Sequence, residues 1–309
     1  MKRALRGIAL LCGLAVLIGL CGCVIEEPEP LWEPETYTGR RVETNAYSAQ
    51  GVQYRIYNDA FAEAVGIDET TFSGHALLLP DAVEDYPITE IAPRAFSELE
   101  ITELRLPVGL ESIGEEAFRQ TKIRRVELPD SLTAVGRDAF DGCLDLESVR
   151  FGTGLKELPT GMFYGCASLR EVNLPEGVEV IGEECFSACD ALEKVTLPDT
   201  LTVIGPYAFW SSGTKDLEFQ IPAGVKAVGA GAFRSTAWLN GRTEEFVIAG
   251  DGVLLRYNGT RTDVTVPATV KYLSDAFTGT AVRRVTLPEG AEECENAWEE
   301  SAVTEIVRK

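Results

Sequence analysis

The chain has 309 residues, and its 28 Lys and Arg residues against 49 Asp and Glu residues give a formal net charge of −21 at neutral pH. This acidic balance argues against binding to nucleic acid or to an anionic membrane surface, because phosphate contacts need clustered basic side chains. The single histidine, His75, rules out a histidine-rich metal site and leaves a Ser-His-Asp or Cys-His arrangement only one possible base. We therefore predict no catalytic residue, no metal site and no cofactor.

Residues 1–22 are predicted to be a lipoprotein signal peptide. A positively charged end precedes an apolar stretch over residues 8–20. Leu20-Cys21-Gly22-Cys23 resembles the lipobox of bacterial lipoproteins, and this resemblance implies cleavage before Cys23 and lipidation of its thiol. The alternative is an uncleaved membrane anchor, because residues 8–25 are just long enough to span a bilayer. Either way, we expect the rest of the chain outside the cytoplasmic membrane, anchored to the bacterial membrane or cell surface.

Two segments are expected before the repeats begin. Residues 23–50 are interpreted as an acidic, proline-rich tether, because they lack apolar periodicity and repeat Glu-Pro pairs. Residues 51–80 are predicted to form an N-terminal β cap, with a hairpin of residues 52–57 and 60–67 around the turn signal Asn58-Asp59. Stacked repeats need such a cap, because the first unit would otherwise expose its apolar residues to water.

A template of 22 to 24 residues then recurs over residues 81–302. Its clearest copy, residues 169–189, fits the pattern L-x-x-V-x-L-P-x-x-L-x-x-I-G-x-x-A-F-x-x-C. The template phenylalanine recurs at a nearly constant spacing, as Phe96, Phe118, Phe140, Phe163, Phe186, Phe209, Phe233 and Phe277, with Trp298 as a weaker last copy. Self-similarity at this period predicts a solenoid, in which each unit buries its apolar side only against its neighbours.

Each template position has a physical reason. Alternating apolar residues such as Val172 and Leu174 predict a short, half-buried strand. Pro175 is expected to end that strand, because proline cannot donate a hydrogen bond to a β ladder. Gly182 is expected to permit a sharp bend, and Phe186 to fill the interior of the coil.

The L-P, I-G and A-F pairs at fixed offsets resemble the bacterial surface leucine-rich repeats of the BspA-like family, from about Val52 to the C-terminus. The resemblance implies a right-handed solenoid exported to the cell surface, in a family often assigned to adhesion or protein binding. It supplies no catalytic residues. We predict a leucine-rich-repeat solenoid, mostly β with short turns or 3-10 segments, of about nine stacked coils.

One interval departs from the period, because Phe233 and Phe277 lie 44 residues apart. Residues 240–260 are predicted to insert a β-hairpin, with strands over 246–249 and 253–257 and turn signals between and after them. We expect this hairpin to form a lateral bump on the rod, with either a binding or a structural role. Residues 303–309 are predicted to be a C-terminal capping strand.

Three cysteines share one template slot, three residues after the phenylalanine. These are Cys143, Cys166 and Cys189, and other units place Ser or Thr there. This pattern favours a tight position for a small side chain, occupied by buried reduced thiols. A disulfide and a thiolate metal site remain alternatives, since stacked coils lie about 4.8 Å apart. Cys185 and Cys294 replace apolar template residues and are expected in the core.

Paired carboxylates occur at Glu115-Glu116 and Glu183-Glu184, in the same template slots. A glycosidase needs two carboxylates that face one sugar bond about 5 to 9.5 Å apart, and adjacent residues on a bend do not indicate this. We interpret them as part of a solvated surface. The absence of a recognisable Asp or Lys/Arg cluster also weighs against a polysaccharide-acting β-helix enzyme, which remains the alternative from the enzyme class.

The outward strand positions vary while the inward positions stay apolar, which is typical of a recognition surface on a repeat scaffold. These candidate binding residues are Glu103, Arg105, Arg125, Glu127, Arg150, Glu171, Asn173, Lys194 and Thr196. We predict an adhesion-type scaffold without catalysis that binds a protein or an extracellular or cell-wall ligand. A strand face that is merely solvated, on a passive envelope spacer, is the remaining alternative.

Overall fold

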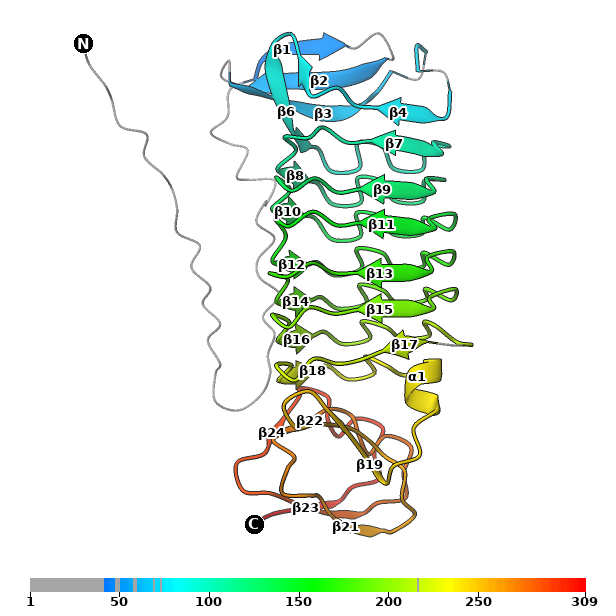
Figure 1. The fold of residues 1–309 in the computed structure, drawn as a ribbon, viewed down its shortest axis with the longest axis vertical. Coiled ribbons are helices and arrows are strands. Elements are labelled where there is room, and N and C mark those ends of the chain that lie inside the picture. Colours follow the sequence, from blue (N-terminus) through cyan, green and yellow to red (C-terminus); the bar gives the residue numbers. More distant parts are fainter. Residues whose placement is uncertain (1–41, 48–50, 58–59, 69, 73, 216) are drawn as a thin grey trace, which may run out of the picture.

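The computed structural model describes residues 42–47, 51–57, 60–68, 70–72, 74–215 and 217–309. These residues form a mostly β, leucine-rich-repeat solenoid of about eleven turns, which confirms the predicted fold class. The coils stack into an elongated column, with short strands on two sides (Figure 1). The predicted signal peptide, Cys23 and most of the predicted tether lie outside the described residues. Within the described part, no helix is long and apolar enough to cross a membrane.

The first end of the column is covered by antiparallel strands. Their order is β1-β2-β3, and β3 then pairs in parallel with β6, which begins the regular stack. A second hairpin is formed by β5 and β6, and its turn residues Glu84 and Asp85 both have a positive φ. These elements are β1 (Val42–Tyr47), β2 (Val52–Tyr57), β3 (Phe61–Ile67), β5 (Ala82–Val83) and β6 (Tyr86–Ile91).

The tether prediction is wrong for residues 42–47. They form β1, which pairs with β2 over its whole length except for one irregularity. The strand covers the edge of β2, whose backbone hydrogen-bonding groups would otherwise face solvent. The sequence of β1 alternates Val, Thr and Ala with polar residues, a weak strand signal that the charged surroundings obscured.

Two strands per coil build two parallel ladders. One ladder, which is interrupted between β7 and β9, contains β4 (Ala76–Leu78), β7 (Glu103–Arg105), β9 (Arg125–Glu127), β11 (Ser148–Arg150), β13 (Glu171–Asn173), β15 (Lys194–Thr196) and β17 (Glu218–Phe219). The other, which is interrupted between β10 and β12, contains β8 (Ser112–Ile113), β10 (Ala134–Val135), β12 (Glu157–Leu158), β14 (Val180–Ile181), β16 (Val203–Ile204) and β18 (Ala227–Val228). Parallel pairing in register aligns equivalent template positions of neighbouring coils into columns.

The template phenylalanines stack in one column inside the coils. From Phe96 to Phe233 each ring lies on the next, with ring centroids 5.2–5.6 Å apart and interplanar angles of 7–21°. All of these side chains are at most 2% exposed. A second, shorter stack pairs Phe277 with Trp298. The period of the sequence therefore reflects a continuous aromatic core along the rod.

The glycine of the I-G pair has a different role from the predicted one. Gly182 and Gly205 do not have a positive φ, so a bend does not require glycine at these positions. A Cβ on Gly205 would instead lie 2.7 Å from the backbone of Glu183 and Gly182 in the preceding coil. The glycine is needed because two coils approach each other closely at this point.

The stack is interrupted after Phe233. The chain forms a short helix, α1 (Ala237–Asn240), and then the predicted hairpin of β19 (Phe246–Ala249) and β20 (Val253–Tyr257). The hairpin is not a lateral bump, because β20 pairs in parallel with β22 (Tyr272–Leu273) and takes the place of a coil strand in a further sheet of the stack. This turn has no template phenylalanine, which explains why counting phenylalanines predicted about nine coils. The remaining strands are β21 (Asp263–Thr265), β22 (Tyr272–Leu273), β23 (Arg284–Leu287), β24 (Glu292–Glu293) and β25 (Glu305–Arg308).

Candidate ligand-binding face

The outward side chains of the first ladder form the candidate site, which we call the strand face. Each three-residue strand from β9 to β15 buries its central valine and exposes the residues on either side. β7 has the same arrangement around a half-buried Leu104. The nine predicted binding residues are all exposed here: Glu103 and Arg105 on β7, Arg125 and Glu127 on β9, Arg150 on β11, Glu171 and Asn173 on β13, and Lys194 and Thr196 on β15.

Register aligns these side chains into two rows. The first row runs Arg125, Ser148, Glu171, Lys194 and Glu218, one residue from each strand of β9 to β17. The second row places Glu127 opposite Arg150 and Asn173 opposite Thr196. Because neighbouring strands lie about 4.8 Å apart, each row presents a different side chain at this interval.

Ion pairs on the strand face are exposed and therefore weak. Arg150 lies 3.3 Å from Glu127, and these two side chains are 78% and 76% exposed. Arg105 similarly lies 3.1 Å from Asp81. Such pairs contribute roughly 0–1 kcal/mol each, so a ligand can replace them at little cost. Among the described residues, Arg125 and Lys194 have no ion-pair partner.

The strand face is electrically balanced although the chain is strongly acidic. Its outward positions from β7 to β17 carry four basic residues (Arg105, Arg125, Arg150, Lys194) and four acidic residues (Glu103, Glu127, Glu171, Glu218). Their formal sum is zero, whereas the whole chain has a net charge of −21. Such a face can distinguish partners by the order of its charges, since like charges that meet across an interface are costly.

One further residue of this face was not predicted from the sequence. Leu78 on β4 lies opposite Arg105 of β7 and is 37% exposed, which adds an apolar side chain at the end of the charged rows. Leu78 belongs to the run Leu77-Leu78-Leu79, in which alternation cannot show which residue points outward. The flanking leucines are completely buried.

The histidine and one of the paired carboxylates considered for catalysis each contact a group of a neighbouring coil. His75 is exposed, and its Nδ1 lies 2.6 Å from the backbone oxygen of Glu100. Glu116 accepts a hydrogen bond from Arg94 of the preceding coil at 2.9 Å. Within the described ranges, no group of three or more His, Cys, Asp or Glu side chains could hold a metal ion.

The cysteine slot is a hydrogen-bonding position as well as a tight one. Cys143, Cys166 and Cys189 are buried free thiols, and each donates to the carbonyl oxygen of the phenylalanine one coil earlier, at 3.2–3.4 Å. Burial raises the pKa of Cys143 to about 11 and that of Cys189 to about 12. Thiols of this kind stay protonated at neutral pH and are poor nucleophiles and poor metal ligands.

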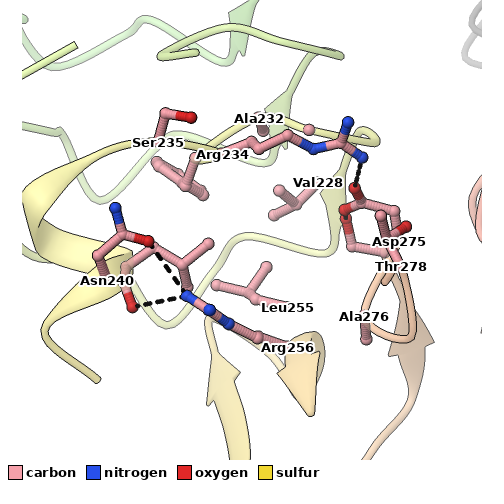
Figure 2. Close-up of a pocket in the computed structure, with 14 residues that line it drawn as sticks. Val228, Ala232, Arg234, Ser235, Asn240, Leu255, Arg256, Asp275, Ala276 and Thr278 are labelled. Atoms are coloured by element: carbon pink, nitrogen blue, oxygen red, sulfur yellow. Dashed lines mark hydrogen bonds and ion pairs between the residues drawn. The ribbon is translucent and has the colours of Figure 1, made fainter. Parts of the chain in front are cut away.

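A cavity of about 330 Å³ lies at the interruption of the stack, and no residue of the strand face lines it. Figure 2 shows Arg234 reaching from the upper side to Asp275 on the right, and Arg256 of β20 along the lower side, where it contacts Asn240 of α1. This cavity was not predicted from the sequence, because the template predicts coils that stack without a gap. The irregular interval between Phe233 and Phe277 was the signal that marked its position.

Comparisons with known proteins agree with this architecture. The chain is a leucine-rich-repeat solenoid, and residues 89–218 match the family described as BspA type leucine rich repeat region, in six copies. No similar sequence was found among curated proteins.

Solved bacterial proteins share the fold. One is a leucine rich cell surface protein from Faecalibacterium prausnitzii, with 24% identity and a TM-score of 0.57, over 86% of this chain and 77% of that one. Another is a leucine-rich repeat protein from Eubacterium ventriosum, with 20% identity and a TM-score of 0.56, over 68% of this chain and 53% of that one. At these identities the likeness concerns the fold.

Proposed function

We propose that this protein is a lipid-anchored scaffold at the bacterial cell surface, which binds a protein or an extracellular or cell-wall ligand through the strand face. The observation that supports this most is the strand face itself. Its side chains are exposed, differ from coil to coil and are held at regular intervals by a rigid, fully packed interior. The BspA-type repeats of residues 89–218 and the cell-surface description of a protein with the same fold also support this proposal.

The strand face is tested by reversing its charge. The unchanged protein is cross-linked on the cell surface, and the partner captured with it is identified. The triple variant Arg105→Glu, Arg125→Glu, Arg150→Glu should no longer capture this partner. A control triple variant, Arg137→Glu, Arg242→Glu, Arg261→Glu, makes the same change in charge away from this face and should retain the partner. Equal capture by the unchanged protein and both variants would exclude the strand face as the binding surface.

The lipid anchor is tested at the adjacent cysteines. Cys23→Ser should abolish incorporation of a labelled fatty acid and release the protein from the membrane fraction, because the thiol that accepts the lipid is lost. Cys21→Ser is the matched control and should leave the fatty-acid incorporation and the membrane association unchanged. Membrane retention without lipid in Cys23→Ser would favour the uncleaved anchor instead.

Two competing functions predict other results. A polysaccharide-acting enzyme should shorten acidic glycans in a depolymerisation assay, and we expect no shortening. A passive envelope spacer should capture no partner, and its deletion should leave adhesion unchanged.

A further inference from the structure

A ladder of backbone hydrogen bonds joins the phenylalanine turns of successive coils. In each turn, the N–H groups of the phenylalanine and of the residues two before and two after it donate to carbonyl groups of the next coil. Glu184, Phe186 and Ala188, for example, donate to Pro206, Ala208 and Trp210 at 2.8–3.0 Å. The same three bonds form at all six junctions from Phe96 to Phe233.

The ladder stops at the coil of Phe233. The N–H groups of Gly231, Phe233 and Ser235 have no hydrogen-bond partner among the described residues. They correspond to the three donors of every preceding coil, so they point toward the C-terminal side of the stack. On that side the next template coil is displaced by the insert, and its Ala276 carbonyl accepts from Tyr257 of β20 instead.

These three donors belong to the wall of the cavity in Figure 2. Gly231 and Phe233 are buried residues, and a buried N–H without a partner is destabilising unless something accepts its hydrogen bond. The volume of about 330 Å³ is near the lower end of the range for small-ligand sites. The cavity is therefore large enough for a small molecule that brings hydrogen-bond acceptors.

Two arginines line the cavity, and they differ in their partners. Arg234 spans the opening, with ion pairs to Asp275 at 3.1 Å and to Glu300 at 3.2 Å. Arg256 contacts only neutral oxygens, Asn240 Oδ1 at 3.3 Å and the Leu239 carbonyl at 3.5 Å. Among the described residues Arg256 has no carboxylate partner, so its positive charge is available to a ligand.

We propose that this cavity binds a small, peptide-like carboxylate, such as an N-acylated dipeptide or the free C-terminus of a peptide. In the six coils from Phe96 to Phe209 the equivalent N–H groups donate to backbone carbonyls of alternate residues, and a short extended peptide presents carbonyl groups in this way. The terminal carboxylate forms charge-assisted hydrogen bonds with Arg256, whose planar guanidinium matches its geometry. This site is separate from the strand face, and the proposal does not depend on the function proposed for that face.

The test follows the amide protons directly by ¹⁵N-correlated NMR of the labelled protein. N-acetyl-Ala-Ala with a free carboxylate should move the amide protons of Gly231, Phe233 and Ser235 downfield as they gain acceptors. The amide protons of Glu184, Phe186 and Ala188 are internal controls, because they already donate to the next coil. The same peptide with a C-terminal amide should bind at least about tenfold more weakly, because it lacks the charge that pairs with Arg256.

A variant pair tests the cation. Arg256→Gln should weaken binding of the acid about tenfold or more and remove the preference for acid over amide. Arg261→Gln is the matched control, since Arg261 is an exposed arginine of the same region that is paired with Glu245 and does not line the cavity. Equal binding of acid and amide, shifts confined to the control amides, or binding of inorganic phosphate but not of the peptide would each overturn the proposal.

Discussion

At the residue scale, the cysteine slot shows how one small side chain links two coils. Cys166 Sγ donates to the Phe140 carbonyl at 3.3 Å, and Ser212 Oγ donates to the equivalent Phe186 carbonyl at 2.5 Å. Threonines in this slot, such as Thr121 and Thr236, donate to the phenylalanine of their own coil instead. All three residue types therefore supply a donor to a buried carbonyl, which accounts for the presence of Cys, Ser or Thr in this slot in the template units after that of Phe96, which has Leu99 there.

Removing the hydrogen-bond donor in this slot should destabilise the protein more than exchanging a thiol donor for a hydroxyl donor. Cys166→Ser replaces the thiol with a hydroxyl that can donate to the Phe140 carbonyl, as Ser212 donates to the equivalent carbonyl of Phe186. Cys166→Ala removes the donor and leaves a small gap. We expect Cys166→Ala to lower the free energy of unfolding by about 1–3 kcal/mol relative to Cys166→Ser. Urea unfolding of both variants measures this difference, and equal stability would show that only size matters at this position.

The buried thiols should also make stability depend on alkaline pH. Burial raises the pKa of Cys143 to about 11 and of Cys189 to about 12, from an ordinary value of 9.0. The unfolded chain therefore loses these protons first as the pH rises, and the folded state becomes less favoured. The stabilisation is complete below pH 9 and should be lost progressively between about pH 9 and 12.

Urea midpoints at pH 8, 9, 10 and 10.5 test this dependence. A Cys143→Ser, Cys189→Ser variant is the control, because other groups also titrate in this range, and its midpoint should fall less steeply. Parallel slopes for the two proteins would mean that these thiols do not contribute.

At the element scale, the strands and turns of each coil are held by close backbone contact. The short strands have only two or three residues, and they gain stability from register with both neighbouring coils. The I-G glycine permits that register, because a side chain there would lie against the preceding coil. Alternation in the sequence predicted the first strand of each coil, such as β13, but not the second, such as β14. The glycine was assigned a local role, because contacts between coils cannot be inferred from a single unit.

A matched pair of glycine substitutions separates these two roles. A Cβ on Gly205 would meet backbone atoms of the preceding coil at 2.7 Å, whereas a Cβ on Gly109 would have no atom within 4 Å. Gly205→Ala should therefore cost about 1–3 kcal/mol of folding free energy by overpacking. Gly109→Ala should leave the thermal midpoint nearly unchanged or raise it slightly. Similar effects of both substitutions would contradict the close approach of the coils.

At the scale of the whole molecule, the rod consists of a long regular stack and a shorter one, joined where β20 replaces a template coil. The buried apolar residues form two clusters accordingly, one from Val52 to Leu255 and one from Leu254 to Ala297. The regular stack could be predicted from the sequence because its period repeats six times without a break. The junction could not, because α1, β20 and the cavity depend on contacts that the template does not contain.

The same distinction applies to the candidate site. Alternation placed the nine polar residues of the strand face on the outside, where the structure has them. It did not show that they align in two rows, whose formal charge is zero once Glu218 of β17 is included. The partner of such a face depends on side-chain chemistry beyond the fold. The capture experiment is therefore needed to identify the proposed partner, and the charge-reversal variants test whether it binds to this face.

Native-state hydrogen exchange of the backbone amides tests the central claim most directly. This claim is that hydrogen bonds between the phenylalanine turns join successive coils and stop at Phe233. The amides of Phe118, Phe163 and Phe209 donate to the next coil and should exchange slowly, at rates set by global unfolding. The amide of Phe233 has no acceptor among the described residues and should exchange much faster, although its ring is equally buried. Equal protection of Phe209 and Phe233 would contradict the account, because it would mean that the ladder continues through the junction.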